Sequence, residues 1–217
     1  MVAASRTSAI FGALGSAQIE KLLAAAPLLE LNADVVLTPA EFENECLLVV
    51  EDGLAIIRAE RAGTDRGIVT CHAGPGTVVL PPRDGETLRT LVPTRVTVVT
   101  AEVRNSLFEL PGAAAVLFAT LAATLRQKHQ TIATLSSVHH VDRVRDKLIQ
   151  LARDHGRVGR DSVRLDFPLT HELLGEMTGS ARETVTRALD ELQEEGFVVR
   201  RGRSYRLNID PNELLSS

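Results

Sequence analysis

Hydrophobic positions along the chain change their period three times. Residues 16–25 place Ile19, Leu22 and Leu23 at intervals of three and four, which predicts a short leading helix. From residue 28 to about residue 103, apolar residues come instead in brief β-rich runs separated by turn residues. These runs cover residues 28–31, 34–39, 46–58, 67–72, 74–82 and 94–103. Many short strands with frequent turns predict a β-sandwich or roll.

The segment 112–141 contains no proline and is rich in alanine and leucine, so it predicts one long helix. Its larger apolar residues are spaced by combinations of three and four: Leu117, Leu121, Leu125, Ile132, Leu135 and Val138. A helix of this size is roughly 30–40 Å long, too long to be covered by one small neighbouring domain. We therefore predict a homodimer that pairs through this helix. The alternative is a helix that packs entirely against its own domain.

The C-terminal part changes pattern again. Val141, Val144, Leu148 and Leu151 mark another helix, with Asp142 as its N-cap and a hinge at its junction with the long helix. Residues 163–169 predict a short strand, residues 170–197 two short helices, and residues 196–209 two strands around a turn at 202. Helices followed by a small hairpin predict a winged helix-turn-helix. The predicted fold is therefore α+β: a β-roll (jelly roll) over 1–111, a dimerisation helix over 112–139 and a winged helix-turn-helix over 140–217.

The two short helices carry the clearest local signals. Thr170 can cap the first helix, and Gly179 allows the tight turn between them. Ser180 and Glu183 fit the S-x-x-E capping box at the start of the second helix. That helix has an apolar inward face (Val185, Ala188, Leu189 and Leu192) and a polar outward face (Arg182, Glu183, Thr186, Arg187 and Asp190).

Composition and charge narrow the classes of function. Of the 217 residues 44% are hydrophobic and 24% charged, as in ordinary globular proteins, and no apolar run reaches the length of a membrane span, so we expect a cytoplasmic protein. The net charge of −4 excludes a generally basic coat for nucleic acid. The charge is uneven, however, because residues 1–111 carry 9 basic and 14 acidic groups, whereas residues 196–206 carry four arginines and no acid. A polyanion contact therefore belongs near the C-terminus.

The outward face of the second helix suits base reading in DNA. Arginine can donate two hydrogen bonds to guanine, and glutamate can accept one from cytosine. We predict that Arg182, Glu183 and Arg187 read bases. The predicted contacts to the DNA backbone are Thr170, His171, Ser180, Thr184, Thr186, Arg200, Arg201 and Arg203. The alternative is that Glu183 only completes the capping box and that the arginines pair with Glu176, Asp190 or Glu191.

The stretch "LTHELLGEMTGSARETVTRALDELQEEGFV" resembles the signature of the Crp/Fnr superfamily of bacterial transcription regulators, with "GSARETVTR" as the core of the recognition helix. The resemblance extends over nearly the whole chain, through the leading helix, "CLLVVEDGLAIIR", the "GPG" turn, the long helix and the terminal wing. It implies double-stranded DNA with TGTGA-like inverted repeats as the target, a homodimer, RNA polymerase as a partner and a small-molecule effector in the roll.

The effector segment departs from the pattern of relatives that bind cyclic AMP. Those relatives use an F-G-E-L cassette followed by an arginine pair, whereas this chain has "GPGTVVLPPRDGETLRTLVPTRV". Pro81 falls near the glutamate position, and either Arg89 with Thr90 or Glu86 falls near the arginine position. The resemblance places the pocket at Val79, Leu80, Pro81, Arg89 and Thr90. We expect no cofactor, and we expect an altered pocket rather than standard binding of cyclic AMP.

Other ligand chemistries find little support. Cys71 and His72 stand where one haem-sensing relative places a ligand, but neighbours on a strand point to opposite faces, so we expect one buried and one exposed side chain. His139, His140 and Asp142 invite a metal site, although a solvated pair is the simpler interpretation. Two cysteines argue against an iron–sulfur cluster that needs four.

Three hypotheses of different class remain. The first is a dimeric DNA-binding regulator with an altered or absent effector. The second is an enzyme, against which stands the absence of any nucleophile–base spacing, phosphate loop or H-E-x-x-H pattern. The third is a ligand-binding or protein-interaction module that keeps its helix-turn-helix for packing. Salt-dependent binding to a palindrome separates the first hypothesis from the other two.

Overall fold

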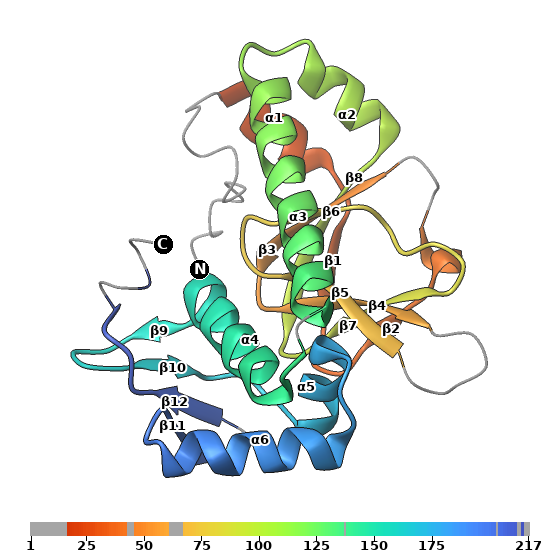
Figure 1. The fold of residues 1–217 in the computed structure, drawn as a ribbon. Coiled ribbons are helices and arrows are strands. Elements are labelled where there is room, and N and C mark those ends of the chain that lie inside the picture. Colours follow the sequence, from red (N-terminus) through yellow and green to blue (C-terminus); the bar gives the residue numbers. More distant parts are fainter. Residues whose placement is uncertain are drawn as a thin grey trace. The chain divides into compact units, whose positions relative to one another are not determined.

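The computed structural model describes residues 17–42, 46–60, 67–136, 138–202, 204–211 and 214 (Figure 1). The chain divides into two compact units. The first comprises residues 1–60 and 70–128, and the second comprises residues 61–69 and 129–217.

The first unit is built on two four-stranded antiparallel sheets. One sheet has the order β1-β8-β3-β6, and the other has the order β2-β7-β4-β5. Their bounds are β1 Leu28–Leu31, β2 Val36–Leu37, β3 Leu47–Asp52, β4 Ala55–Glu60, β5 Gly67–Ala73, β6 Val78–Val79, β7 Glu86–Thr90 and β8 Thr94–Val99. The helices are α1 Ala17–Ala25, the short 3₁₀ helix η2 Pro39–Glu41, α2 Ala101–Phe108 and α3 Ala113–Ser136. The predicted roll and its leading helix are confirmed.

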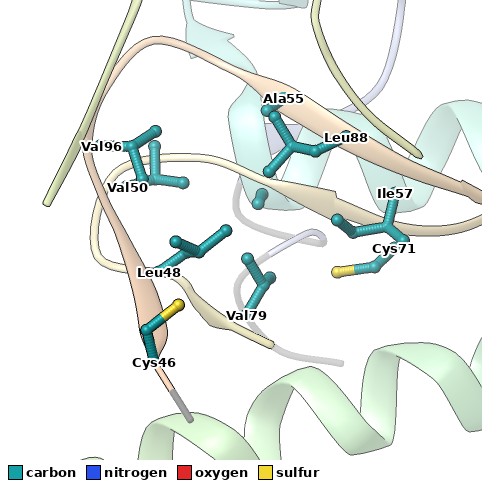
Figure 2. Close-up of a cluster of buried hydrophobic side chains, with 10 residues drawn as sticks. Cys46, Leu48, Val50, Ala55, Ile57, Cys71, Val79, Leu88 and Val96 are labelled. Atoms are coloured by element: carbon teal, nitrogen blue, oxygen red, sulfur yellow. The ribbon is translucent and has the colours of Figure 1, made fainter. Parts of the chain in front are cut away.

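The first four residues of β3, 47–50, are all apolar, and their packing explains why. Leu47 and Val49 pack on one face against α1, α2 and α3, whereas Leu48 and Val50 face the opposing sheet. Successive side chains of a strand point to opposite faces, so both faces are buried and no polar alternation remains. Figure 2 shows the second cluster, in which Leu48 and Val50 lie with residues of the other strands. Full burial of each such side chain contributes about 1.5–3 kcal/mol.

The predicted strand over 94–103 is wrong in its second half. Strand β8 ends at Val99, and Thr100 caps helix α2, its side chain accepting a hydrogen bond from the Val103 amide at 3.4 Å. The β-branched run up to Val99 concealed this helix start, because a threonine is equally suited to a strand and to a cap.

The long helix α3 is confirmed, but its apolar residues divide between two faces. Leu117 is 1% exposed and, with Leu121, packs against the roll. Phe118, Leu125 and Ile132 are 76%, 54% and 65% exposed. These three are spaced by seven residues, as positions of one coiled-coil seam are. The predicted single stripe is therefore wrong: only Leu125 and Ile132 of its members belong to this exposed seam, and Phe118 was missed.

The second unit contains three helices and a small sheet. The helices are α4 His140–His155, α5 His171–Thr178 and α6 Arg182–Glu194. The strands are β9 Arg157–Val158, β10 Val163–Leu165, β11 Val198–Arg201 and β12 Ser204–Leu207, in the antiparallel order β11-β12-β10-β9. The helices contact one another, with α4 against β10 and α6 against β11 (Figure 1). This arrangement confirms the predicted winged helix-turn-helix.

The predicted N-cap at Asp142 is wrong. Helix α4 begins at His140 with His139 as its N-cap, and no side chain caps it. Asp142 lies in the first turn instead, where its carboxylate complements the positive end of the helix. In the described part of the chain, no single helix has the length and apolar character needed to cross a membrane, although the pair α2 and α3, bent by 119°, meets that test of length and composition.

Candidate DNA-binding surface

The turn between α5 and α6 is fixed at both ends of the first helix. The Thr170 hydroxyl accepts a hydrogen bond from the Leu173 amide at 3.1 Å, which confirms the predicted cap. Gly179 adopts φ 63°, a left-handed conformation that favours glycine, and a β-carbon there would lie 2.7 Å from Leu135 Cδ2. The turn therefore requires glycine, and it sets the direction in which α6 leaves α5.

Helix α6 begins one residue later than the capping-box motif predicts. Its N-cap is Ala181, which makes no side-chain cap hydrogen bond. The Ser180 hydroxyl donates instead to the Thr178 carbonyl at 3.4 Å and lies 3.2 Å from His140 Nδ1. The predicted capping box between Ser180 and Glu183 is therefore wrong, and the carboxylate of Glu183 is not used to start the helix.

The two faces of α6 differ sharply. Val185, Ala188, Leu189 and Leu192 are buried, as predicted. Arg182, Glu183 and Arg187 are exposed. Within the described part of the chain, no ion pair involves any of these three side chains. The alternative in which the arginines pair with Glu176, Asp190 or Glu191 is not what the structure shows. The three charged tips are available to a ligand.

His171 lies where α5, α6 and the wing come together. Its Nδ1 is 2.8 Å from the Thr186 hydroxyl, which itself donates to the Arg182 carbonyl at 3.0 Å. The Thr186 hydroxyl thus connects His171 to the first turn of α6. Burial lowers the pKa of His171, and the positive charges of Arg200 and Arg182 lower it further. His171 is therefore close enough to Arg182 at the start of α6 and to Arg200 on β11 for both charges to act on it.

The remaining predicted backbone contacts are distributed around this region. Ser180, Thr184 and Thr186 are half-buried, and Thr170 is exposed. Arg200 is exposed on β11, and its Nε donates to the Gly202 carbonyl at 2.9 Å. Arg201 ends β11. The side chain of Arg201 and the whole of Arg203 lie outside the described residues.

Sequence reasoning missed one cationic residue that connects the elements below this surface. Arg143, on α4, is only 9% exposed. Its Nη1 donates to the Leu135 carbonyl at 3.4 Å, and its Nη2 contacts His140 Nδ1. Because His140 also contacts Ser180, these residues link the end of α3, the start of α4 and the turn before α6. The inward position of Arg143 on α4, beside Val144, was the one available signal.

The predicted effector residues lie in two different places in the roll. Val79, Leu80 and Pro81 line a pocket of about 280 Å³ between the strands and α3. Arg89 and Thr90 do not line it. Arg89 pairs with Asp34 at 2.7 Å, and the Thr90 hydroxyl donates to the Asn32 carbonyl at 2.7 Å. Both side chains are therefore engaged where β7 meets β2 and the turn that precedes it.

Of the other candidate ligand pairs, Cys71 and His72 differ from expectation, whereas His139 and His140 do not. Cys71 and His72 are each 1% exposed, so the prediction of one exposed side chain is wrong. Gln127 of α3 explains the burial of His72, because its side chain accepts from the His72 amide and donates to the His72 carbonyl, each at 3.0 Å. His139 and His140 are exposed, as a solvated pair would be.

Comparisons with known proteins agree with this geometry. Residues 142–216 match the model of the Crp-like helix-turn-helix domain. The global nitrogen regulator of Synechocystis sp. is 32% identical over 97 residues, which are 45% of this chain and 43% of that protein. The CRP-like cAMP-activated global transcriptional regulator of Mycobacterium tuberculosis is 30% identical over 106 residues, 49% of this chain and 47% of that protein. The aligned regions thus span less than half the length of these curated relatives.

Among solved structures, a CooA mutant from Carboxydothermus hydrogenoformans superposes with a TM-score of 0.76 at 17% identity, over 98% of this chain and 97% of that chain. At this identity the superposition establishes the fold alone. Residues 142–216, which contain α5, α6 and the strands of the small sheet, are thus similar to a Crp-like helix-turn-helix domain. The resemblance to Crp/Fnr regulators seen in the recognition-helix motif is confirmed, and the fold of the rest of the chain agrees with it.

Proposed function

We propose that the protein is a homodimeric, sequence-specific DNA-binding transcriptional regulator of the Crp/Fnr type. One observation carries the proposal. Arg182, Glu183 and Arg187 are exposed on the first turns of α6, and no described residue pairs with them. A helix of this kind fits a major groove. Its two arginines and one glutamate are suited to reading bases, because a surface that only attracted phosphates would not need the glutamate.

The chemistry of these tips favours sites that contain G·C pairs. Arginine donates two hydrogen bonds to guanine O6 and N7, and glutamate accepts from cytosine N4. This is consistent with the TGTGA-like half-sites that the resemblance implies. We assign Arg182, Glu183 and Arg187 to base readout. Thr170, His171 and Arg200 would contact phosphates and set the register, because they surround the start of α6 with donors and positive charge.

The exposed seam of α3 supports the homodimer. Phe118, Leu125 and Ile132 share one side of the helix at seven-residue spacing, and smaller residues, Ala115 and Ala122, complete the alternation of three and four. Large apolar side chains in such a row are expected to be covered by a partner. A second copy of the same helix covers the row through two-fold symmetry, which also presents two copies of α6 to a palindrome.

We also propose a hinge between α3 and α4 and an effector site in the roll. The segment Val138–His139 separates α3 from α4 and would act as the hinge at which an effector or a partner changes the spacing of the two recognition helices. Pro81 lines the pocket, and the resemblance places it near the position of the glutamate in cyclic AMP-binding relatives, so we propose an altered effector site. RNA polymerase would be the partner by resemblance, and the cytoplasm the compartment.

A titration of the full chain onto short duplexes tests this function. The probe is a palindrome of two TGTGA-type half-sites, and the control is a duplex of the same composition with scrambled half-sites. We expect the palindrome to bind at least 1,000-fold more tightly, with both affinities falling steeply as salt rises. Equal affinity for the two duplexes, or no binding by a well-folded protein, would contradict the proposal. The second outcome would favour a ligand-binding module whose helix-turn-helix does not read DNA.

A further inference from the structure

The pocket in the roll is lined mainly by apolar residues, together with a few polar ones. Ile57, Val79, Leu80, Leu121 and Leu125 supply apolar walls from β4, the segment at β6 and helix α3. Cys71 adds a buried sulfur (Figure 2). At about 280 Å³ the pocket is at the small end of the range for ligand sites, so it fits a small molecule.

Four polar residues also line the pocket, and two of them are already engaged. The Thr124 hydroxyl donates to the Val78 carbonyl at 2.7 Å, so its only proton is used. Glu86 accepts from the Arg83 backbone amide at 3.2 Å, which holds its carboxylate beside the loop. The side chains of Arg83 and Lys128 remain. Neither makes an ion pair with another residue in the described part of the chain.

This combination disfavours a ligand with many hydroxyl groups. Hydroxyl groups of a ribose or sugar placed against Ile57, Val79 and Leu121 would lose their hydrogen bonds to water without replacement on these apolar walls, which makes their burial there unfavourable. An apolar body against the same walls gains from burial. The two cations that line the pocket belong to separate segments, the loop after Pro82 and helix α3, and each can attract an anionic group.

We propose that the pocket binds a small monoanion with an apolar body, such as a medium-chain or aryl carboxylate, whose anionic group lies between Arg83 and Lys128. The ligand would touch α3 through Leu121 and Leu125, and Leu125 also belongs to the exposed seam. Binding would therefore change the packing of the seam. That regulatory consequence rests on the proposed function, whereas the binding itself does not.

Isothermal titration of the full chain with octanoate, 1-octanol, octylamine and cyclic AMP tests the proposal. The three octyl probes share one apolar body and differ in charge. We expect octanoate to bind at least about tenfold more tightly than 1-octanol, and octylamine and cyclic AMP to bind more weakly still. Equal binding of octanoate and octylamine, or tighter binding of cyclic AMP than of octanoate, would overturn the proposal.

Variants locate the site. Arg83→Gln and Lys128→Gln each remove one cation, and we expect each to weaken octanoate about tenfold while leaving 1-octanol unchanged. Lys21→Gln, on an exposed position of α1, is the matched control and should leave all affinities unchanged. Leu80 is 53% exposed, so Leu80→Trp can narrow the pocket without disturbing the core and should block octanoate. Full octanoate affinity in Leu80→Trp would place the binding elsewhere.

DNA affinity is measured on the same samples with and without octanoate. Octanoate binding with no DNA binding would support the ligand site and reject the regulatory function. Specific DNA binding with no octanoate binding would reject the ligand site and leave the proposed function standing.

Discussion

At the scale of single residues, the helix-turn-helix assigns different tasks to chemically similar groups. Arg182 and Arg187 are exposed, and no described residue forms an ion pair with them. Arg143 is buried and contacts the Leu135 carbonyl and His140. The exposed pair can serve recognition because the buried one secures the scaffold beneath it. Substitution of Arg182 or Arg187 should therefore change DNA specificity, whereas substitution of Arg143 should lower the free energy of unfolding.

Arg182→Ala should weaken binding to the TGTGA-type palindrome by about 1–3 kcal/mol and relax discrimination at one base step, because a bidentate contact to guanine is lost. Fluorescence anisotropy with a set of single-base variants of the duplex measures both effects. Arg95→Ala, at an exposed position of β8, is the control and should change neither. Equal losses on specific and random DNA for Arg182→Ala would defeat its assignment to base readout.

His155 gives the C-terminal unit a pH dependence. Burial lowers its pKa to about 4, and its ring meets Phe167 edge-on at 6.3 Å. His155 takes up a proton near pH 6.5 in the unfolded chain and only near pH 4 in the folded chain. The contribution of neutral His155 to the free energy of unfolding is therefore complete above pH 6.5 and is lost as pH falls toward 4. We expect the difference in unfolding free energy between the native chain and His155→Gln to fall by up to about 3 kcal/mol over this window.

Urea titrations of both proteins at several pH values give this difference directly. Other groups that titrate in both chains cancel in the comparison. A difference that stays constant from pH 7 to pH 4 would show that His155 is not held neutral by the fold.

At the scale of elements, the start of α5 shows how a local cap supports the recognition surface. The Thr170 hydroxyl satisfies the Leu173 amide, one of the donors that a helix leaves open at its first turn. Thr170→Ala should therefore lower the free energy of unfolding by about 1 kcal/mol, whereas Thr170→Ser, which keeps the hydroxyl, should stay close to the native value. Urea unfolding followed by circular dichroism measures both. Loss of the same size in both variants would mean that the hydroxyl does not act as a cap.

The seam on α3 predicts the oligomeric state. Ile132 is 65% exposed in the single chain, so its replacement by aspartate should leave the fold intact and place a charge in the dimer interface. We expect Ile132→Asp to sediment as a monomer at micromolar concentration, and the native chain to sediment as a dimer under the same conditions. Ala123→Asp is exposed on the same helix but off the seam and should remain dimeric. A dimeric Ile132→Asp protein would rule out this seam as the interface.

The elements that sequence predicts best are those with a long, regular period. Helix α3 and the helix pair α5 and α6 have clear spacing of apolar residues, and their existence and type are confirmed. Thr100 was missed as a cap, and Ser180 was wrongly assigned as one, because a hydroxyl serves a strand, a turn or a cap according to the backbone around it. Asp142 was wrongly predicted as the N-cap of α4, because an aspartate is common both at the N-cap and in the first turn, and the observed N-cap is His139.

The candidate sites divide in the same way. The outward charges of α6 follow from its helical period, so their exposure could be predicted. The lining of the roll pocket could not be predicted, because Arg83 and Lys128 are far apart in sequence and line one pocket only when α3 packs beside the strands. The resemblance placed Arg89 in the pocket, but Asp34, on a separate segment, forms an ion pair with it.

For the whole molecule, we expect a homodimer with two identical recognition helices related by a two-fold axis. Each α6 helix would present Arg182, Glu183 and Arg187, and pairing of the two chains through the seam on α3 would hold the two α6 helices at a set distance. A palindrome then binds through both α6 helices together, and its affinity depends on the distance between its half-sites. Half-sites separated by about one helical turn, 10–10.5 base pairs between centres, present equivalent major grooves on the same side of the duplex.

The most direct measurement is therefore a titration of the native dimer onto duplexes that differ only in half-site spacing. The account predicts tight binding of one dimer to a palindrome whose half-sites are about one helical turn apart. Inserting about five base pairs between them, which turns one half-site to the opposite side, should reduce affinity to that of a single half-site. Affinity that does not change with the insertion, or saturation by independent monomers, would contradict the claim that paired recognition helices read this DNA.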